Sequence, residues 1–263
     1  MADLLTRLVS TVQNQRRIQP LLLLLDYDGT LVETAPWPEL ARPTPELLEL
    51  LSRLTAQGDL KVAVVSGRPL RELRELLPIP GLDLLGSHGG EALIADRLQF
   101  PQGAAIDFNG LALWRNRLAR RLKPFRGWWI EDKPQGFALH YRQVPEEQSH
   151  EFIETLERCR ERLRQEGGFQ LLAGKKVLEI LPLDVSKGAA IQEILALPGF
   201  QGFFPVYIGD DITDESAFQA LGGRGLAIRV GGSRNRTEAS YYLPDTKMVR
   251  NFLALLAASP EDH

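Results

Sequence analysis

Several features that mark particular classes of protein are scarce in this sequence. Its 263 residues include a single cysteine, Cys159, so no disulfide can form within the chain, and a reducing cytoplasm is the expected location. The formal net charge is −3 and no long run of one sign occurs, so the charge pattern gives no support for nucleic-acid binding. The most apolar stretch, residues 20–25, is far shorter than the roughly 20 residues of a membrane-spanning helix. We therefore expect no membrane association and no targeting segment.

The composition that remains is that of an ordinary soluble protein. Hydrophobic residues make up 44% of the chain and charged residues 25%, which is enough apolar material for a sizeable core. A length of 263 residues suits one large domain with an insert, or two domains. We expect the chain to act as a monomer.

The two ends of the chain alternate between strands and helices. The leucine run at residues 21–25 is unbroken, as in a strand covered on both faces of a parallel sheet. Further strands are predicted at residues 60–65, 82–85, 206–208 and 225–230, and helices at 4–17, 44–57, 69–77, 186–196, 214–220 and 246–257. This alternation predicts an open, Rossmann-like α/β fold with a parallel sheet. Polar clusters follow several strands, which is where such sheets bind ligands.

The middle of the chain has a different rhythm. Helices are predicted at residues 111–122 and 146–165, and two hairpins at 127–131 with 136–142 and at 169–172 with 177–181. The order αββαββ indicates a separate, mostly antiparallel α+β unit. We therefore predict a core formed by residues 1–104 and 183–263, interrupted by a cap domain at residues 105–182.

The segment from Asp26 to Thr30 follows the leucine run and contains two carboxylates two residues apart. Asp26 could attack phosphorus and form an aspartyl-phosphate, which divides one difficult step into two easier ones. Asp28 would point the same way only if the strand ends there, and could then protonate the leaving oxygen and later activate water. Two carboxylates repel a phosphate dianion, so a cation is needed, and magnesium prefers such oxygen ligands.

The remaining candidates lie far away in sequence but in equivalent places. Asp210 follows another predicted strand and is a further candidate ligand for magnesium. Lys187 and Ser66 could donate to phosphoryl oxygens, since such catalysis is largely electrostatic. Gly29 and Gly67 would let backbone N–H groups approach the phosphate closely.

Each piece also has a structural explanation. Asp and Gly are common in turns, Asp210 and Asp211 could cap a helix, Lys187 could be a solvated surface lysine, and Ser66 with Gly67 could form a simple loop. Taken alone, each motif favours that explanation. All four follow a predicted strand or begin a helix, and chance agreement of all four is improbable.

These motifs resemble the haloacid dehalogenase superfamily of aspartate-nucleophile phosphatases. The matching segments are Asp26-Tyr27-Asp28-Gly29-Thr30-Leu31, Ser66-Gly67-Arg68, Lys187-Gly188 and Gly209-Asp210-Asp211 with Asp214. The resemblance implies that Asp26 is the nucleophile and Asp28 the general acid and base. It also implies magnesium held by Asp26, Asp210 and the backbone carbonyl of Asp28. Asp211 and Asp214 would orient waters and Lys187. The resemblance also implies that the insert between the Ser66 and Lys187 motifs is a cap domain of the C2 type.

A narrower resemblance covers nearly the whole chain. Five segments are similar to the trehalose-6-phosphate phosphatases: Gly86-Ser87-His88-Gly89-Gly90-Glu91, Glu131-Asp132-Lys133, His140-Tyr141-Arg142, Lys176-Val177-Leu178-Glu179 and Gly209 to Glu215. The resemblance implies sugar contacts from Glu131, Lys133 and Glu179, and charged side chains do bind hydroxyl groups strongly. One departure occurs, because Leu181 stands where the family often carries a basic residue.

The candidate substrate-binding residues are Gly67, Arg68, His88, Glu131, Lys133, Arg142 and Glu179. Without the resemblance, the cap charges would be cross-strand ion pairs on a solvated hairpin, which contribute little to stability. Trp128 and Trp129 could stack on a sugar, although core packing is the commoner role. His88 could equally be a core histidine or a residue beside the phosphate.

The expected reaction is the magnesium-dependent hydrolysis of trehalose 6-phosphate to trehalose and phosphate, so the expected partner is a small-molecule sugar phosphate. Three alternatives stay open: a phosphatase for another glycoside phosphate, of the glucosylglycerol or mannosylglycerate type; a phosphomutase; and a non-catalytic sugar-phosphate sensor. The intact set of Asp26, Asp28, Lys187 and Asp210 argues against the sensor. Selectivity within the first class depends on details of the cap.

Overall fold

A computed structural model describes residues 2–99, 107–174, 176–232 and 236–258. The chain divides into two compact units, of which the first comprises Met1–Pro101 and Ser186–His263 and the second Gln102–Val185. The expected boundary between residues 104 and 105 lies outside the described residues. Within the described ranges, no helix has the length and apolar composition needed to cross a membrane.

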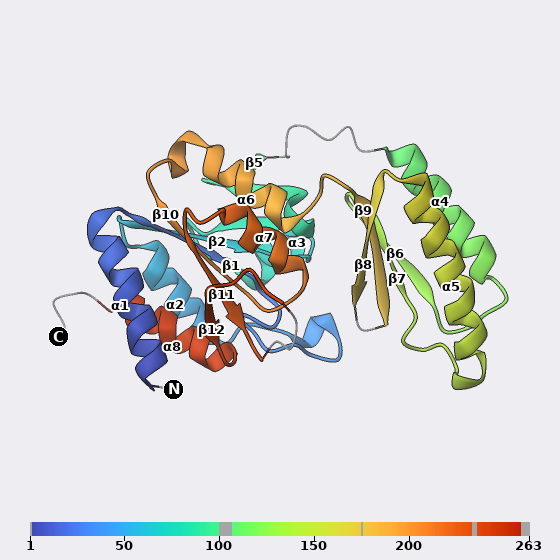
Figure 1. The fold of residues 1–263 in the computed structure, drawn as a ribbon, viewed down its shortest axis with the longest axis horizontal. Coiled ribbons are helices and arrows are strands. Elements are labelled where there is room, and N and C mark those ends of the chain that lie inside the picture. Colours follow the sequence, from blue (N-terminus) through green and yellow to red (C-terminus); the bar gives the residue numbers. More distant parts are fainter. Residues whose placement is uncertain (1, 100–106, 175, 233–235, 259–263) are drawn as a thin grey trace. The chain divides into compact units, whose positions relative to one another are not determined.

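The first unit is built on an eight-stranded sheet with the order β12-β11-β10-β1-β2-β3-β4-β5 (Figure 1). Neighbouring strands from β12 to β3 are parallel, and only β4 and β5 are antiparallel additions at the edge. The strands are β1 (Leu21–Leu25), β2 (Leu60–Val65), β3 (Asp83–Gly86), β4 (Glu91–Ile94), β5 (Arg97–Gln99), β10 (Phe204–Gly209), β11 (Leu226–Val230) and β12 (Tyr241–Leu243). The helices are α1 (Ala2–Ile18), α2 (Pro45–Thr55), α3 (Leu70–Leu76), α6 (Lys187–Ala196), α7 (Thr213–Leu221) and α8 (Thr246–Ala257).

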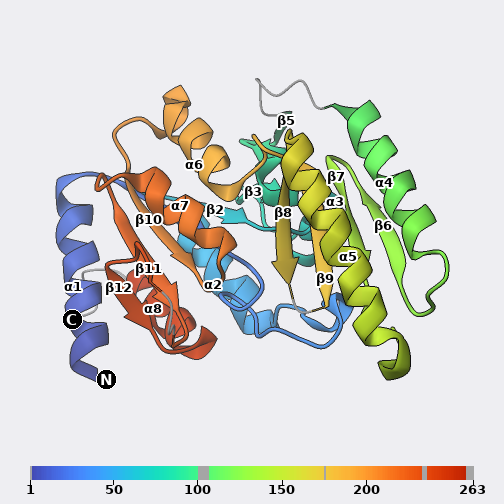
Figure 2. The same ribbon diagram turned by 45° about the vertical axis from the view of Figure 1, so that its right-hand side comes forward.

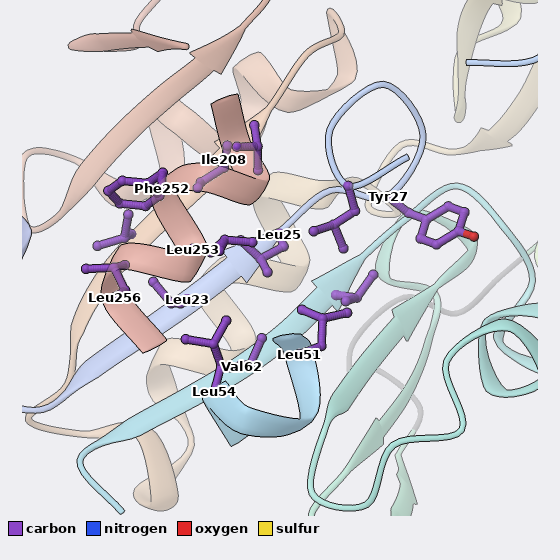
Figure 3. Close-up of a cluster of buried hydrophobic side chains, with 14 of the residues drawn as sticks. Leu23, Leu25, Tyr27, Leu51, Leu54, Val62, Ile208, Phe252, Leu253 and Leu256 are labelled. Carbon is purple, nitrogen blue, oxygen red and sulfur yellow. The ribbon is translucent and has the colours of Figure 1, made fainter. Parts of the chain in front are cut away.

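Helices cover both faces of this sheet. Side chains of α1, α2, α3 and α8 pack on one face, in a buried cluster that includes Leu23, Leu25 and Tyr27 as well as Leu51 and Phe252 (Figure 3). Side chains of α6 and α7 pack on the other face, together with alternate leucines of β1. Because every leucine of β1 is fully buried, the apolar run of the sequence has no polar face. The expectation of a parallel α/β core is confirmed.

The second unit is a four-stranded antiparallel sheet with the order β6-β7-β9-β8, formed by β6 (Trp129–Lys133), β7 (Gly136–His140), β8 (Phe169–Gly174) and β9 (Val177–Pro182). Its helices, α4 (Phe108–Leu122) and α5 (Glu146–Glu166), lie along one face of the sheet (Figure 2). Buried side chains of both helices pack there against Phe137, Leu139, Leu178 and Ile180. The αββαββ order that the sequence predicts is therefore confirmed.

One predicted strand was wrong in its position, and three strands were not predicted. The strand expected at residues 127–131 occupies Trp129–Lys133, because Gly127 has a left-handed φ of 76° at a place where a Cβ would collide with the backbone of Gln143. The unpredicted strands β4, β5 and β12 are edge strands of three or four residues.

Candidate active site

Three candidate residues follow adjacent parallel strands. Asp26 comes directly after β1, Ser66 after β2, and Asp210 after β10. Strand β1 pairs in parallel with both β2 and β10, so the three residues lie at the same edge of the sheet. Because β1 ends at Leu25, Asp26 and Asp28 both belong to the loop at that edge.

Lys187 joins two of the sequence motifs through direct contacts. Its Nζ donates to Asp26 Oδ1 at 2.6 Å and to Asp214 Oδ1 at 2.7 Å. The lysine is the first residue of α6, which begins there because Ser186 Oγ accepts a hydrogen bond from Ala189 N–H at 3.1 Å. Only 3% of Lys187 is exposed, so its ammonium is a fixed positive charge beside Asp26.

Burial and neighbouring charges shift the pKa values of Asp26, Lys187 and Asp210. Burial raises the pKa of Asp26 well above its ordinary value, although the ammonium of Lys187 opposes the rise. Burial lowers the pKa of Lys187, but Asp214 and Asp26 outweigh it, so the pKa is raised and the lysine stays charged. Burial and the neighbouring charges of Asp214 and Asp211 raise the pKa of Asp210 to about 6. Three carboxylates thus surround one ammonium group, and burial opposes the ionisation of Asp26 and Asp210 when no further cation is present.

Asp214 is completely engaged by protein groups. Besides Lys187, its Oδ1 accepts from the Tyr207 hydroxyl at 2.7 Å, and its Oδ2 accepts from Asp211 N–H at 2.9 Å. Tyr207 was missed by sequence reasoning. The sequence feature that could have indicated Tyr207 is its hydroxyl in the buried strand β10, two residues before Gly209. A buried phenol needs a hydrogen-bond partner.

The carboxylates fit a divalent cation. Ligand oxygens of Asp26, Asp210 and Asp214 lie within 4.8 Å of one another. Asp26 Oδ2 is buried and, among the described residues, has no hydrogen-bond partner, whereas the oxygens of Asp214 are occupied. Gly29 has φ 86°, and a Cβ there would collide with the Asp210 carboxylate. A hard cation held by oxygen ligands suits Asp26 and Asp210 best.

Asp28 faces a different partner. Arg68 donates from Nε and one terminal nitrogen to its two carboxylate oxygens, both at 2.7 Å. The same guanidinium donates to Pro38 O at 2.8 Å and lies 5.1 Å from the centre of the Tyr27 ring. The sequence predicts Arg68 as a substrate contact. In the structure it ties the Asp28 side chain to the loop that follows β2 and to the segment around Pro38.

The loop after β2 contacts the turn after β3 at the same edge of the sheet, through Ser66, Gly67 and His88. Ser66 Oγ accepts from Arg68 N–H at 3.2 Å, and Ser66 O accepts from His88 N–H at 2.9 Å. His88 is buried with φ 58°, a left-handed conformation that few residues other than glycine adopt. Its ring packs against Gly67, where a Cβ would lie 2.7 Å from His88 Nε2.

In the second unit, the sheet face away from α4 and α5 carries the candidate cap residues. Lys133 Nζ donates to Glu179 Oε1 at 2.5 Å, and Glu131 Oε2 lies 2.8 Å from His140 Nε2. The register places Glu131 and Glu179 on either side of Ala138, so their side chains share this face. Arg142 lies in the exposed turn after β7.

The departure at Leu181 has a structural counterpart. Leu181 is 1% exposed, and a Cβ at the facing residue, Gly136, would lie 2.7 Å from a methyl carbon of the leucine. The position is therefore packed with apolar atoms.

A parallel α/β core with an inserted αββαββ cap, and an aspartate and lysine cluster at the carboxyl ends of its strands, define the haloacid dehalogenase class of hydrolase. The family model for trehalose-phosphatase matches residues 24–247, and the chain belongs to that family.

The chain is also similar to individual known proteins. The chain is 32% identical over 236 residues to a probable trehalose-phosphate phosphatase of Sinorhizobium fredii, covering 89% of this chain and 87% of the relative. It is 34% identical over 249 residues to an uncharacterized glycosyl hydrolase of Mycobacterium tuberculosis, covering 90% of this chain and 18% of the relative. The C-terminal domain of Candida albicans trehalose-6-phosphate phosphatase has a similar fold, with a TM-score of 0.82, 23% identity and coverage of 95% and 96%. The chain spans 18% to 60% of the length of the first curated relatives it matches.

Proposed function

We propose that this protein is a magnesium-dependent phosphatase that hydrolyses trehalose 6-phosphate to trehalose and phosphate. The observation that carries the proposal is the contact of Lys187 with both Asp26 and Asp214, at 2.6 and 2.7 Å. Lys187 is 161 positions from Asp26 and 27 positions from Asp214 in the sequence, and the contacts bring all three together around the candidate nucleophile, Asp26. Membership of the trehalose-phosphatase family supports the choice of substrate.

In the first step, a carboxylate oxygen of Asp26 attacks phosphorus and the bond from phosphorus to the sugar oxygen breaks. Asp28 donates a proton to that departing oxygen. An ammonium group has three N–H donors, and Lys187 uses two of them on Asp26 and Asp214. The third is available for a phosphoryl oxygen, together with the hydroxyl of Ser66 and backbone N–H groups near Gly67.

In the second step, water attacks the aspartyl-phosphate, and Asp28 now accepts the proton of the attacking water. The bond between phosphorus and Asp26 breaks, which releases phosphate and restores the free carboxylate. Asp26, Asp210 and the backbone carbonyl of Asp28 would hold the magnesium ion. When bound, the ion neutralises carboxylate charge and polarises a phosphoryl oxygen.

The proposal divides the work between two domains. The catalytic core, residues 1–104 and 183–263, carries phosphoryl transfer, and the cap, residues 105–182, selects the sugar. The Lys133–Glu179 and Glu131–His140 pairs support this division, because they are polar, partly exposed groups on a face that α4 and α5 do not cover. The protein would act on its own, without nucleic acid or membrane, in the cytoplasm.

The test is phosphate release from a panel of phosphate esters with and without magnesium. The panel contains trehalose 6-phosphate, glucosylglycerol phosphate, mannosylglycerate phosphate, glucose 6-phosphate and p-nitrophenyl phosphate. Preference for trehalose 6-phosphate, with loss of activity in Asp26→Asn, is expected. Higher kcat/KM on another glycoside phosphate would reject the substrate, and an active Asp26→Asn variant would reject the nucleophile. An isomeric sugar phosphate formed on adding a sugar bisphosphate would indicate a mutase.

A further inference from the structure

Two adjacent tryptophans in the cap have opposite environments. The indole N–H of Trp128 donates to Leu122 O at 2.9 Å and to Phe125 O at 3.1 Å, and its ring packs against the helix-covered core of the unit. Trp129 is 38% exposed and, as the next residue, points to the other face of the sheet. Trp128 therefore has a structural role, and the exposed Trp129 has no comparable place in the core of the unit.

The exposed indole is held in place by a second ring. Trp129 and His140 are directly opposite in the pairing of β6 with β7, and their rings stack with centroids 4.7 Å apart and an interplanar angle of 7°. His140 Nε2 is in turn 2.8 Å from Glu131 Oε2. The hydrogen bond from His140, assisted by the charge of Lys133, lowers the pKa of Glu131, so this carboxylate stays ionised as an acceptor. The rings thus form a rigid platform beside a charged acceptor.

The same face carries further groups that suit hydroxyls. Trp129, Glu131 and Lys133 alternate along β6 and therefore share one face, and Glu179 joins them across the small residue Ala138. Lys133 is already paired with Glu179, so the carboxylate of Glu131 leaves this group of side chains with a net negative charge. Such a surface repels a phosphate dianion and favours an uncharged polyhydroxyl ring. A pyranose has an apolar ring face for the indole and hydroxyl edges for the carboxylates.

We propose that Trp129, supported by His140, is a stacking subsite for the phosphate-free pyranose ring of the substrate. The inference rests on the proposed function, which supplies a disaccharide phosphate. It adds that an aromatic platform on the cap, beyond the charged residues, distinguishes a disaccharide phosphate from a smaller phosphate ester.

The experiment measures kcat/KM for trehalose 6-phosphate and for p-nitrophenyl phosphate, which has no pyranose ring. In Trp129→Ala the ratio of the two values falls about tenfold, mainly through a higher KM for the disaccharide, because an aromatic contact of this size is lost. Trp129→Phe keeps most of the ratio, and His140→Ala lowers it less than Trp129→Ala does. The matched control, Trp128→Phe, lowers the melting temperature and keeps the ratio.

An unchanged ratio in Trp129→Ala would overturn the subsite, as would an equal fall in Trp128→Phe. A second measurement does not depend on turnover. Titration of the protein with trehalose should change indole fluorescence in the wild type and not in Trp129→Phe. Failure of the proposed function is distinguishable, since the wild type would then prefer another ester of the panel. In that case the ratio of kcat/KM is measured for the preferred glycoside phosphate against p-nitrophenyl phosphate. The same changes in Trp129→Ala and Trp128→Phe then support or overturn the subsite.

Discussion

Arg68 holds both carboxylate oxygens of Asp28, with nitrogen to oxygen distances of 2.7 Å each, although the two residues are 40 positions apart. The Arg68 side chain is 8% exposed and the Asp28 side chain 36%, so the arginine is shielded from water while the carboxylate keeps partial access to it. The bidentate pair fixes the direction of the residue that we propose as general acid and base, and one carboxylate oxygen must release its Arg68 donor when Asp28 carries the proton.

Arg68→Ala should lower kcat for trehalose 6-phosphate by roughly ten- to a hundredfold, because Asp28 loses its fixed orientation. Arg68→Lys keeps the positive charge but loses the planar guanidinium that binds both oxygens, so its kcat should lie between those of the wild type and Arg68→Ala. Steady-state kinetics with a sugar phosphate and with p-nitrophenyl phosphate provide the check. The better leaving group needs less protonation, so an equal loss on both substrates would contradict the assignment.

Lys187→Met should remove activity and destabilise the metal-free protein by about 3–5 kcal/mol, because Asp26 and Asp214 would remain buried without their cation. Urea unfolding in the presence of a chelator measures the free energy. Lys247→Met, at an exposed position of α8, is the control and should change stability by less than about 0.5 kcal/mol. Similar unfolding midpoints for the two variants would count against a buried, charge-bearing role of Lys187.

The metal-free protein should lose stability as the pH rises from about 4 through 6. The pKa of Asp210 is raised to about 6, above its value in the unfolded chain. Its contribution is therefore fully present below the unfolded pKa and is lost as the pH passes the folded pKa. Thermal unfolding across this range should show the decline in wild type and a smaller one in Asp210→Asn.

Magnesium should reverse that decline, because it binds the ionised carboxylates of the folded state. At a hundredfold excess over Kd the gain is about 2.7 kcal/mol, or several degrees in Tm. Asp210→Asn should show little of this gain at pH 7. A melting temperature of wild type that is the same with magnesium and with chelator would exclude the metal site.

Gly29→Ala should abolish most activity, because Gly29 has φ 86° and a Cβ would collide with the Asp210 carboxylate. Gly81→Ala is the matched control, since Gly81 has φ 78° with open space around a Cβ. Both changes should cost about 1–2 kcal/mol of backbone strain. Only Gly29→Ala should also impair magnesium-dependent turnover, and comparable activity in both variants would refute a positional role for Gly29.

The strong local patterns of the sequence were enough for the parallel core and for the αββαββ cap. The leucine run of β1 has no polar position, and the N-cap of α2 is Thr44, whose hydroxyl accepts from Leu47 N–H at 3.3 Å. The short edge strands β4, β5 and β12 were missed, because three or four residues carry too little periodicity. The start of β6 was missed because the backbone conformation of Gly127 depends on a tertiary contact with Gln143.

The sequence by itself determined which residue types end each strand and in which order, because strand and helix periodicity and turn chemistry are local properties. Only the tertiary structure decided which of those residues touch. It paired Lys187 with Asp26 and Asp214, gave Asp28 to Arg68, and brought in Tyr207 and His140, which had no assigned role. It also separated Trp128, which packs on the helix-covered core just before β6, from Trp129, the exposed first residue of that strand, because only packing chooses which side is covered.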